Sequence, residues 1–356
     1  MELKINQVID SRYKIISKEG KGATSLVYKV LDLTNNAFKA LKILTTAKNV
    51  DVAFKKEAGI LSSLNFEHYV TPIDDFGIFT FENENYPYMV LEFYPNKTIQ
   101  NIASTNTYLL FSNNELEYYF KRILLGLKGI HDNQVTKMIH KDLKPQNILL
   151  NAKWDPFIAD FGISQVLQTE KNTLIEASGT PKYMAPELFL ENNYDKNINQ
   201  PYYIDIYAIG VMLYAYSTGM IPFENFDVID YPEQTHKKEI ATRDLNLWMD
   251  LVKPSVYNPE INRALENVIL RAMAKDYHKR YQTLNELMDD FDQIDNNNFK
   301  PFEDYNTRPK NIEKPLVTYV SKFNRFLKIF NWKWLVMMIL ILLVIVFGFA
   351  LVINLV

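Results

Sequence analysis

The sequence predicts an α+β fold with two unequal lobes, a small β-rich lobe and a larger α-helical lobe, followed by one transmembrane helix. Residues 12–95 contain short runs of β-branched and aromatic residues, which are typical of strands. From about residue 98 onward the apolar residues recur mostly at helical spacing. Residues 334–353 carry no charge, and a helix of twenty residues spans roughly 30 Å, the thickness of a bilayer's hydrocarbon core.

Individual elements follow from the same patterns. Strands are expected at Tyr13–Ser17, Leu26–Leu31, Ala37–Ile43 and Tyr88–Glu92, with a helix at Val52–Leu64. Further helices are expected at Asn114–Asp132, Tyr203–Ser217, Ile261–Ala274 and Thr283–Ile294. Ser112 and Glu115 stand three residues apart before the first of these four helices, which predicts a capping box.

Composition excludes several classes of protein. The chain has 356 residues, of which 47% are hydrophobic, so a disordered chain is excluded. It contains no cysteine, which excludes disulfide scaffolds, thiolate metal sites and cysteine nucleophiles. A net charge of −3 gives no global footprint for nucleic acid.

The C-terminal part differs from the rest in charge. From Lys300 onward eight basic side chains face three acidic ones, a net charge of +5, which leaves −8 for residues 1–299. Four of the basic residues, Lys322, Arg325, Lys328 and Lys333, directly precede the apolar segment. Because basic residues favour the cytoplasmic side, the N-terminal body is expected in the cytoplasm, at the cell membrane.

The order of segments in this part predicts a tail anchor. Residues 296–333 are expected to form a basic juxtamembrane linker, since asparagine, proline and mixed charge are typical of linkers. The membrane span is expected at 334–353, and residues 354–356 at its outer end. A buried core helix is the alternative for 334–353, but such helices usually keep a polar edge. The N-terminus has neither a long apolar core nor a cleavage site, so it is not a secretory signal.

A glycine-containing loop is the first feature that points to chemistry. It lies between two expected strands and contains Gly20, Lys21, Gly22, Ala23, Thr24, Ser25 and, after Leu26, Val27. Glycines at such a place allow backbone N–H groups to approach phosphate oxygens. By itself the pattern is also compatible with an ordinary turn.

Lys42 and Glu57 are a second candidate pair. Lys42 ends a strand-like run, Ala40-Leu41-Lys42, and Glu57 lies on the helix expected after it. Each alone is most simply a solvated charge. Together they make sense if Glu57 orients Lys42 toward phosphate oxygens.

The most informative run is Ile139-His140-Lys141-Asp142-Leu143-Lys144-Pro145-Gln146-Asn147-Ile148-Leu149, followed thirteen residues after Asn147 by Asp160-Phe161-Gly162. Phosphoryl transfer requires a carboxylate that orients the incoming hydroxyl, oxygen ligands for magnesium and a cation near the transferred group. Asp142, Asn147, Asp160 and Lys144 provide these functional groups.

With these motifs the chain resembles the protein kinase family, in particular the bacterial serine/threonine kinases of eukaryotic type. The resemblance covers about residues 10–295, and its motifs occur in the order of the family. After the loop, Lys42, Glu57 and the two runs above come Ala185-Pro186-Glu187, Asp205 and Arg280. The resemblance implies the bilobal protein kinase fold, with an N-lobe at about 10–95 and a C-lobe at about 96–295.

The resemblance also implies roles for single residues. Asp142 is the expected catalytic base, Lys144 neutralises charge on the transferred phosphoryl group, and Asn147 and Asp160 bind magnesium, for which manganese is an alternative. Lys42 holds the ATP phosphates and pairs with Glu57. Leu91 is expected at the back of the adenine pocket, with Glu92–Tyr94 as the hinge between the lobes. Glu187 and Arg280 are expected to form a structural ion pair.

Three residues depart from the family pattern. Ser25 replaces the third glycine of the loop, Tyr207 replaces a frequent tryptophan, and Lys141 replaces the usual arginine before the catalytic aspartate. Lysine retains the charge but lacks the bidentate fork of arginine. Activation by loop phosphorylation is therefore an open question, although Thr173 and Ser178 are the expected phosphosites between Asp160 and Glu187.

Two functions remain open at this point. The first is a membrane-anchored serine/threonine kinase that transfers the ATP γ-phosphoryl group to protein hydroxyls, including those of a second copy of itself in trans. Lys144 and the Gly179-Thr180-Pro181 run favour the serine/threonine class by resemblance. The alternative is a pseudokinase-like, ATP-binding scaffold that recruits partners to the membrane.

Overall fold

The computed structural model describes residues 2–22, 25–45, 62, 69–102, 110–132, 139–160, 181–189, 202–223, 226–228, 249–296, 299–307 and 319–321. The chain divides into two compact units. The first unit comprises residues 1–222 and 250–311, and the second comprises residues 223–249 and 312–356. Both lobes predicted from the sequence belong to the first unit.

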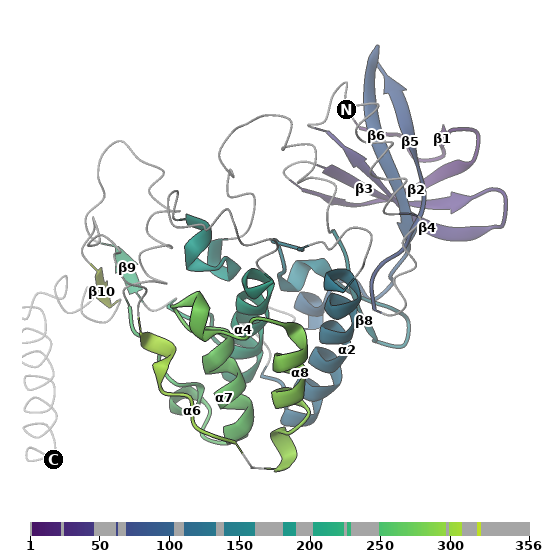
Figure 1. Cartoon of the computed structure of the whole chain (residues 1–356). Helices are drawn as coiled ribbons and strands as arrows, with labels where there is room; N and C mark the ends of the chain where they lie inside the picture. Colours follow the sequence, from purple (N-terminus) through teal and green to yellow (C-terminus); the bar gives the residue numbers. More distant parts are fainter. Residues whose placement is uncertain are drawn as a thin grey trace, which may run out of the picture. The chain divides into compact units, whose positions relative to one another are not determined.

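The small lobe is built on a six-stranded antiparallel sheet with the strand order β1-β2-β3-β4-β6-β5 (Figure 1). The strands are β1 (Val8–Ile9), β2 (Tyr13–Lys21), β3 (Ser25–Asp32), β4 (Ala37–Leu44), β5 (Ile73–Phe81) and β6 (Glu84–Glu92). All four strands expected from the sequence are present. β6 starts four residues earlier than expected, and the expectation did not include β1 or β5.

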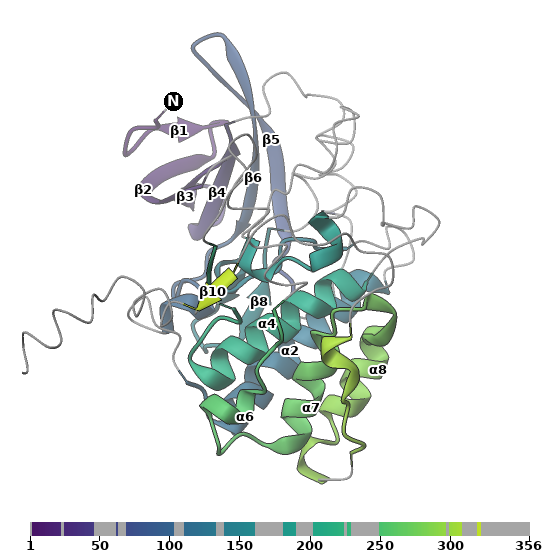
Figure 2. The ribbon, with the colours of Figure 1, turned by 90° about the vertical axis from the view of Figure 1, so that its left-hand side faces the viewer.

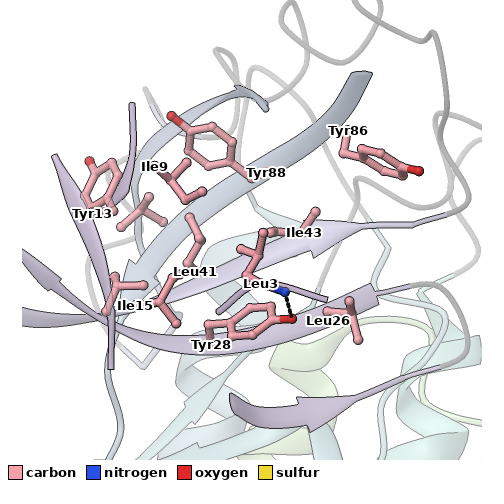
Figure 3. Packing of buried hydrophobic residues seen from close by; sticks show 12 residues of the cluster. Leu3, Ile9, Tyr13, Ile15, Leu26, Tyr28, Leu41, Ile43, Tyr86 and Tyr88 are labelled. Atoms are coloured by element: carbon pink, nitrogen blue, oxygen red, sulfur yellow. Dashed lines mark hydrogen bonds between the residues drawn. The ribbon is translucent and has the colours of Figure 1, made fainter. Parts of the chain in front are cut away.

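One face of this sheet carries the core of the small lobe. Because side chains alternate along a strand, Leu26, Tyr28 and Val30 of β3 point to the same side as Leu41 and Ile43 of β4. Figure 3 shows Leu26, Tyr28, Leu41 and Ile43 in one cluster with Tyr13, Ile15 and Tyr88. Full burial of one such aliphatic side chain contributes roughly 1.5–3 kcal/mol.

Residues 2–9 form part of this core. Leu3 is 6% exposed and Ile9 is fully buried in the same cluster. The backbone N–H of Leu3 donates to the phenol oxygen of Tyr28 at 3.1 Å (Figure 3). The segment that precedes the first long strand is therefore integrated into the sheet.

The large lobe is a group of helices around α4 (Tyr203–Thr218), as two views at right angles show (Figures 1 and 2). Around it lie α2 (Asn113–His131), α6 (Pro254–Tyr257), α7 (Arg263–Ala272) and α8 (Leu284–Phe291). Every residue of α4 is buried, as expected of a helix that is apolar on all sides. The four long helices expected from the sequence are all present.

The helix ends are defined by local hydrogen bonds. Ser112 and Glu115 form the predicted capping box, in which Ser112 Oγ accepts from the Glu115 N–H and Glu115 Oε2 accepts from the Ser112 N–H. Gly219 ends α4 in the left-handed conformation with φ of 72°, which glycine adopts without steric cost. α7 and α8 begin one to two residues later than expected, after the capping residues Asn262 and Thr283.

A short segment after α8 lies on the large lobe. Asn306 bridges the Leu251 backbone, because its Oδ1 accepts from the Leu251 N–H at 2.8 Å and its Nδ2 donates to the Leu251 carbonyl at 3.4 Å. The Phe302 N–H donates to Asn267 Oδ1 at 2.6 Å, and Lys279 pairs with Asp304 at 3.0 Å. Residues 299–307 therefore contact the large lobe, and the linker remains a prediction for residues 308–318 and 322–333.

In the second unit the structure describes two strands, β9 (Phe226–Val228) and β10 (Tyr319–Ser321), which pair antiparallel. Within the described part of the chain, no helix is both long enough and apolar enough to span a membrane. The predicted span at 334–353 lies outside the described residues, as do the helix expected at Val52–Leu64, apart from Ser62, and the residues 354–356.

Candidate active site

A two-stranded ribbon brings the expected metal ligands together. β7 (Ile148–Leu150) pairs antiparallel with β8 (Pro156–Ile158), and Ile148 lies opposite Ile158. Asn147 directly precedes β7, and Asp160 follows β8 after one residue, so both lie at the same end of the ribbon. The Ala159 N–H donates to the Asn147 carbonyl at 2.8 Å. The twelve residues between Asn147 and Asp160 thus form a hairpin.

Asp142 is held by two neighbours on the same loop. Asn147 Nδ2 donates to the Asp142 backbone carbonyl at 2.8 Å and lies 3.3 Å from its Oδ2. Lys144 Nζ donates to the same Oδ2 at 2.7 Å. Among the described residues no hydrogen bond is made to Asp142 Oδ1. One carboxylate oxygen is therefore fixed, and the other is available to a substrate hydroxyl.

Lys42 and Asp160 form an ion pair of 2.6 Å between Nζ and Oδ1. This pair joins β4 of the small lobe to the end of the ribbon in the large lobe. Desolvation raises the pKa of the Asp160 carboxyl, but the positive charge of Lys42, its hydrogen bond, and the more distant His140 and Lys144 lower it further, so that the net pKa lies below the ordinary value. Asp160 is therefore ionised near neutral pH, as a magnesium ligand must be.

Asp205 fixes the backbone that leads into Asp142. This fully buried carboxylate accepts from the backbone N–H of His140 at 2.7 Å and from that of Lys141 at 2.8 Å. It also lies 2.8 Å from His131 Nε2. Burial alone would raise the pKa of Asp205, but the hydrogen bond from His131 and the other donors lower it below its usual value. These contacts hold Lys141 at a φ of 62°, a conformation that non-glycine residues rarely adopt.

His140 connects the two ends of the site. Its Nδ1 accepts from the Asp142 N–H at 3.3 Å, so the other ring nitrogen carries the proton in the neutral ring. That nitrogen, Nε2, lies 2.9 Å from the carbonyl of Ala159, to which it donates. The His140 ring therefore links Asp142, the expected base, to Ala159, the residue before Asp160. From the sequence His140 was only part of the run, and its position two residues before Asp142 was the signal for this role.

Four of the predicted nucleotide residues on the strands share one face of the sheet. Val27 lies opposite Lys42 across β3 and β4, and Ala40 lies opposite Leu91 across β4 and β6. Directly paired residues and residues two apart on a strand point to the same side. Val27, Ala40, Lys42 and Leu91 thus face away from the Leu41 and Ile43 side, which carries the core.

The described part of the glycine loop is a tight connection between β2 and β3. Gly20 and Lys21 end β2 opposite Val27 and Leu26, and the Gly22 N–H donates to the Ser25 carbonyl at 2.8 Å. A methyl group placed on Gly20 would meet no atom of the described residues within 4 Å. The space beside Gly20 is therefore open on the protein side, as a loop that covers phosphates requires.

At the predicted hinge, Glu92 ends β6 and is exposed, whereas Tyr94 is buried. Burial is also the main reason why the pKa of the Tyr94 phenol is raised above its ordinary range. Its ring centroid lies 5.1 Å from that of Phe157 on β8. No sequence pattern indicates this contact, because the two residues lie on segments that only the folded chain brings together.

Several predicted site residues fall outside the described residues. They are Ala23, Thr24, Glu57, Thr173 and Ser178. The pairing of Lys42 with Glu57 and the two phosphosites accordingly stay predictions.

The expected structural ion pair is confirmed. Arg280, 1% exposed, donates from Nη1 and Nη2 to the two carboxylate oxygens of Glu187 at 2.5 and 2.9 Å. Its guanidinium carbon lies 4.7 Å from the centroid of the Tyr207 ring, which is itself buried. Tyr207 therefore packs against this ion pair.

The residues fit a magnesium ion that enters together with phosphate. Asn147 uses its Nδ2 to bind Asp142, so that its Oδ1 remains as a hard oxygen ligand, and no hydrogen bond or ion pair to Asp160 Oδ2 occurs among the described residues. No group of three or more acidic or histidine side chains suited to a metal occurs in the described ranges. Two side-chain oxygen ligands are sufficient, because magnesium in such sites is usually bound by one or two side chains together with substrate phosphates.

Comparisons with known proteins agree with this geometry. The protein kinase domain family matches residues 13–291. A probable serine/threonine-protein kinase PknB of Lactococcus lactis is 31% identical over 297 residues, which cover 81% of this chain and 43% of that protein. The serine/threonine-protein kinase PrkC of Bacillus subtilis is 29% identical over 291 residues, which cover 80% and 40%. The chain spans about two fifths of the length of these relatives.

The crystal structure of the Mycobacterium tuberculosis PknI kinase domain has the same fold, with a TM-score of 0.56 and 20% identity over 82% of this chain and all of that one. A two-lobed fold with this site and this family match defines a protein kinase, and the chain belongs to the protein kinase family. The two relatives named above are bacterial serine/threonine kinases, which supports the bacterial eukaryotic type expected from the sequence.

Proposed function

We propose that the chain transfers the γ-phosphoryl group of ATP to serine and threonine hydroxyls of proteins. The observation that carries this proposal is the convergence of Asp142, Lys144 and Asn147 with the Lys42–Asp160 pair at one end of the β7–β8 ribbon. The relatives named as serine/threonine kinases support the choice of hydroxyl.

In the proposed reaction the substrate hydroxyl oxygen forms a bond to the γ-phosphorus, and the bond from that phosphorus to the β–γ bridging oxygen breaks, so that ADP leaves. The hydroxyl proton moves to Asp142 Oδ1, the carboxylate oxygen without a partner among the described residues. Asn147 and Lys144 hold the carboxylate in place during this transfer. The ammonium groups of Lys144 and Lys42 stabilise negative charge on phosphate oxygens.

Asn147 and Asp160 would hold magnesium, which neutralises charge on the phosphate oxygens when bound. Manganese fits the same oxygen ligands. Val27, Ala40 and Leu91 would line the side of the small lobe against which the base of ATP packs, because they share a face with Lys42.

The test is phosphate transfer by the full chain from ATP labelled at the γ-position, with magnesium, to itself and to generic protein acceptors. Asp142→Asn should abolish incorporation and leave the thermal midpoint of unfolding near that of the wild type. Asp132→Asn, at the exposed C-terminal end of α2, is the matched control and should retain activity. Tight binding of ATP without any transfer by the wild type would favour the scaffold function instead.

We infer that the kinase phosphorylates a second copy of itself on Thr173 or Ser178. A phosphate there could pair with Lys141, whose charge replaces that of the usual arginine. Mass spectrometry of active wild-type protein should find phosphate on one of the two residues, and Asp142→Asn protein should lack it. Fully active protein with an unmodified loop would contradict this inference.

A further part of the proposal is a cytoplasmic kinase held at the cell membrane by residues 334–353. It is supported by the twenty uncharged residues and by the basic residues that precede them. Removal of residues 316–356 should move the protein from the membrane fraction to the soluble fraction and lower autophosphorylation in cells, because confinement to a surface raises local concentration. A protein that stays membrane-bound after this deletion would contradict the anchor.

A further inference from the structure

The predicted hinge is attached to the small lobe through two consecutive residues. Lys39 Nζ on β4 lies 2.6 Å from Glu92 Oε2. Lys29 Nζ on β3 lies 4.6 Å from the ring centroid of Phe93 and 4.1 Å from that of Phe38. Glu92 and Phe93 are therefore bound to the small-lobe sheet.

The next residue, Tyr94, is attached to the large lobe. Its buried ring packs against Phe157 of β8, with ring centroids 5.1 Å apart and planes tilted by 44°. The change of lobe along the hinge therefore falls at the peptide between Phe93 and Tyr94.

Phe157 is itself fixed from its other side. Its ring lies 5.9 Å from the ring of Tyr69, and the Tyr69 carbonyl accepts from the Ile158 N–H at 2.8 Å. α2 leaves no space behind this contact, because a methyl group on Gly126 would come within 2.7 Å of the Tyr69 carbonyl oxygen. The backbone of Tyr69 is therefore held between β8 and α2.

Three residues beyond Phe157 the same chain reaches Asp160. Phe157 thus lies between the hinge, where the proposed function puts the adenine, and the carboxylate that would hold magnesium. We propose that Phe157 is a positioning residue that sets the distance between the hinge at Tyr94 and Asp160. This distance allows one nucleotide to bind the hinge through its adenine and Asp160 through its metal-bound phosphates. This proposal rests on the proposed function.

The physical consequence concerns ligands that use one end of the site or both. Adenosine needs the hinge end only, whereas ATP with magnesium needs the hinge and Asp160 at the correct separation. Loss of the aromatic contact between Phe157 and Tyr94 therefore weakens magnesium–ATP more than adenosine. An aromatic pair of this kind corresponds to a change of roughly 2- to 10-fold in a binding constant.

The experiment measures the dissociation constants of adenosine and of ATP with magnesium for the full chain by isothermal titration calorimetry. For Phe157→Leu we expect the constant for magnesium–ATP to rise about 3- to 10-fold, with that for adenosine changed less than about twofold. Phe157→Tyr keeps the ring and should restore both wild-type values. The control variant is Phe79→Leu, which removes an aromatic ring of β5 that packs on Phe81. It should change neither dissociation constant.

Equal weakening of both ligands in Phe157→Leu, or no change in either, would overturn the positioning role. If Phe157→Leu does not fold, Phe157→Met carries the same comparison. A wild-type protein that binds neither adenosine nor ATP would overturn the proposed function together with this inference. A wild type that binds both ligands, with an unchanged ratio in the variant, would overturn the inference alone.

Discussion

Lys42 and Asp160 are 118 residues apart in the sequence, and their side chains meet at 2.6 Å. The lysine lies on the face of the small-lobe sheet that also carries Val27, Ala40 and Leu91. The aspartate follows the β7–β8 hairpin of the large lobe. The pair is thus a direct side-chain link between the two halves of the proposed ATP site. Both charges suit the same ligand, because one attracts phosphate oxygens and the other attracts the metal bound to them.

Lys42→Met should lower phosphate transfer by at least about 100-fold, the usual cost of removing one group that stabilises charge in a transition state. The fold should persist, because methionine fills a similar volume on the sheet. Activity is measured with labelled ATP, and folding by circular dichroism. Lys18→Met is the matched control on the same sheet, since Lys18 pairs with the exposed Glu2 on the surface, and it should retain full activity.

Asp205→Asn should destabilise the protein by about 3 kcal/mol at pH 7, because an amide cannot accept from all the donors around this buried site. The effect should depend on pH. The pKa of Asp205 is lowered in the folded state, so its stabilising contribution is complete above the unfolded pKa of about 3.9 and is lost as the pH falls through the folded value. Urea unfolding between pH 7 and pH 3 should therefore show that the difference between wild type and variant shrinks at acid pH. A constant difference would contradict this linkage.

Glu187→Gln should cost about 3–5 kcal/mol of unfolding free energy, because it leaves the guanidinium of Arg280 buried without a counter-charge. Chemical unfolding followed by fluorescence measures this value. Arg263→Ala breaks a pair whose arginine side chain is 55% exposed, and it should cost less than about 1 kcal/mol. Similar costs for the two variants would show that burial does not determine the contribution of these pairs.

Leu3→Ala should destabilise the protein by about 2 kcal/mol, the low end for a buried leucine, since Leu3 lies at the edge of the small-lobe core. Ile5→Ala is the control two residues away. Ile5 is 67% exposed, so its truncation should stay within about 0.5 kcal/mol. Thermal unfolding of both variants measures the difference, and equal midpoints would mean that residues 2–9 do not belong to the core.

Asn306→Ala should lower the unfolding free energy by about 1–2 kcal/mol, because the N–H and carbonyl of Leu251 lose their partner. Thr307→Ala should have little effect, since its hydroxyl makes only a weak 3.4 Å contact with Asp304 on the surface. Hydrogen exchange at the Leu251 amide gives an independent measurement. Unchanged protection of this amide in Asn306→Ala would show that the docked segment does not stabilise the lobe.

The regular elements could be predicted from the sequence because their patterns are local. β3 and β4 consist of short runs of mostly apolar residues, and α2 carries its apolar residues at helical spacing after a capping box. β5 escaped prediction because Asp74, Asp75 and Gly77 interrupt its apolar pattern. Asp75 is tolerated there because Arg12 and Tyr13 bind its carboxylate, contacts that lie more than sixty residues away in the sequence.

The sequence allowed the residues of the candidate site to be predicted, but not the contacts that hold them in place. Motif order identified Asp142, Asn147 and Asp160, whereas the support by His140 and Asp205 depends on helices and loops that meet only in the fold. Residues 299–307 were read as linker because asparagine and mixed charge are typical of flexible segments. Here those same polar groups, in Asp304 and Asn306, bind the large lobe.

The docked segment around Asn306 has a mechanical consequence. Any pull on the chain beyond Thr307 acts first on the contacts of residues 299–307 with Leu251, Asn267 and Lys279, before it can reach α8. These contacts are a few hydrogen bonds and one exposed ion pair, much weaker than the buried core of the helices. Under tension they would yield early, so that residues 299–307 separate from the large lobe while its helices stay folded.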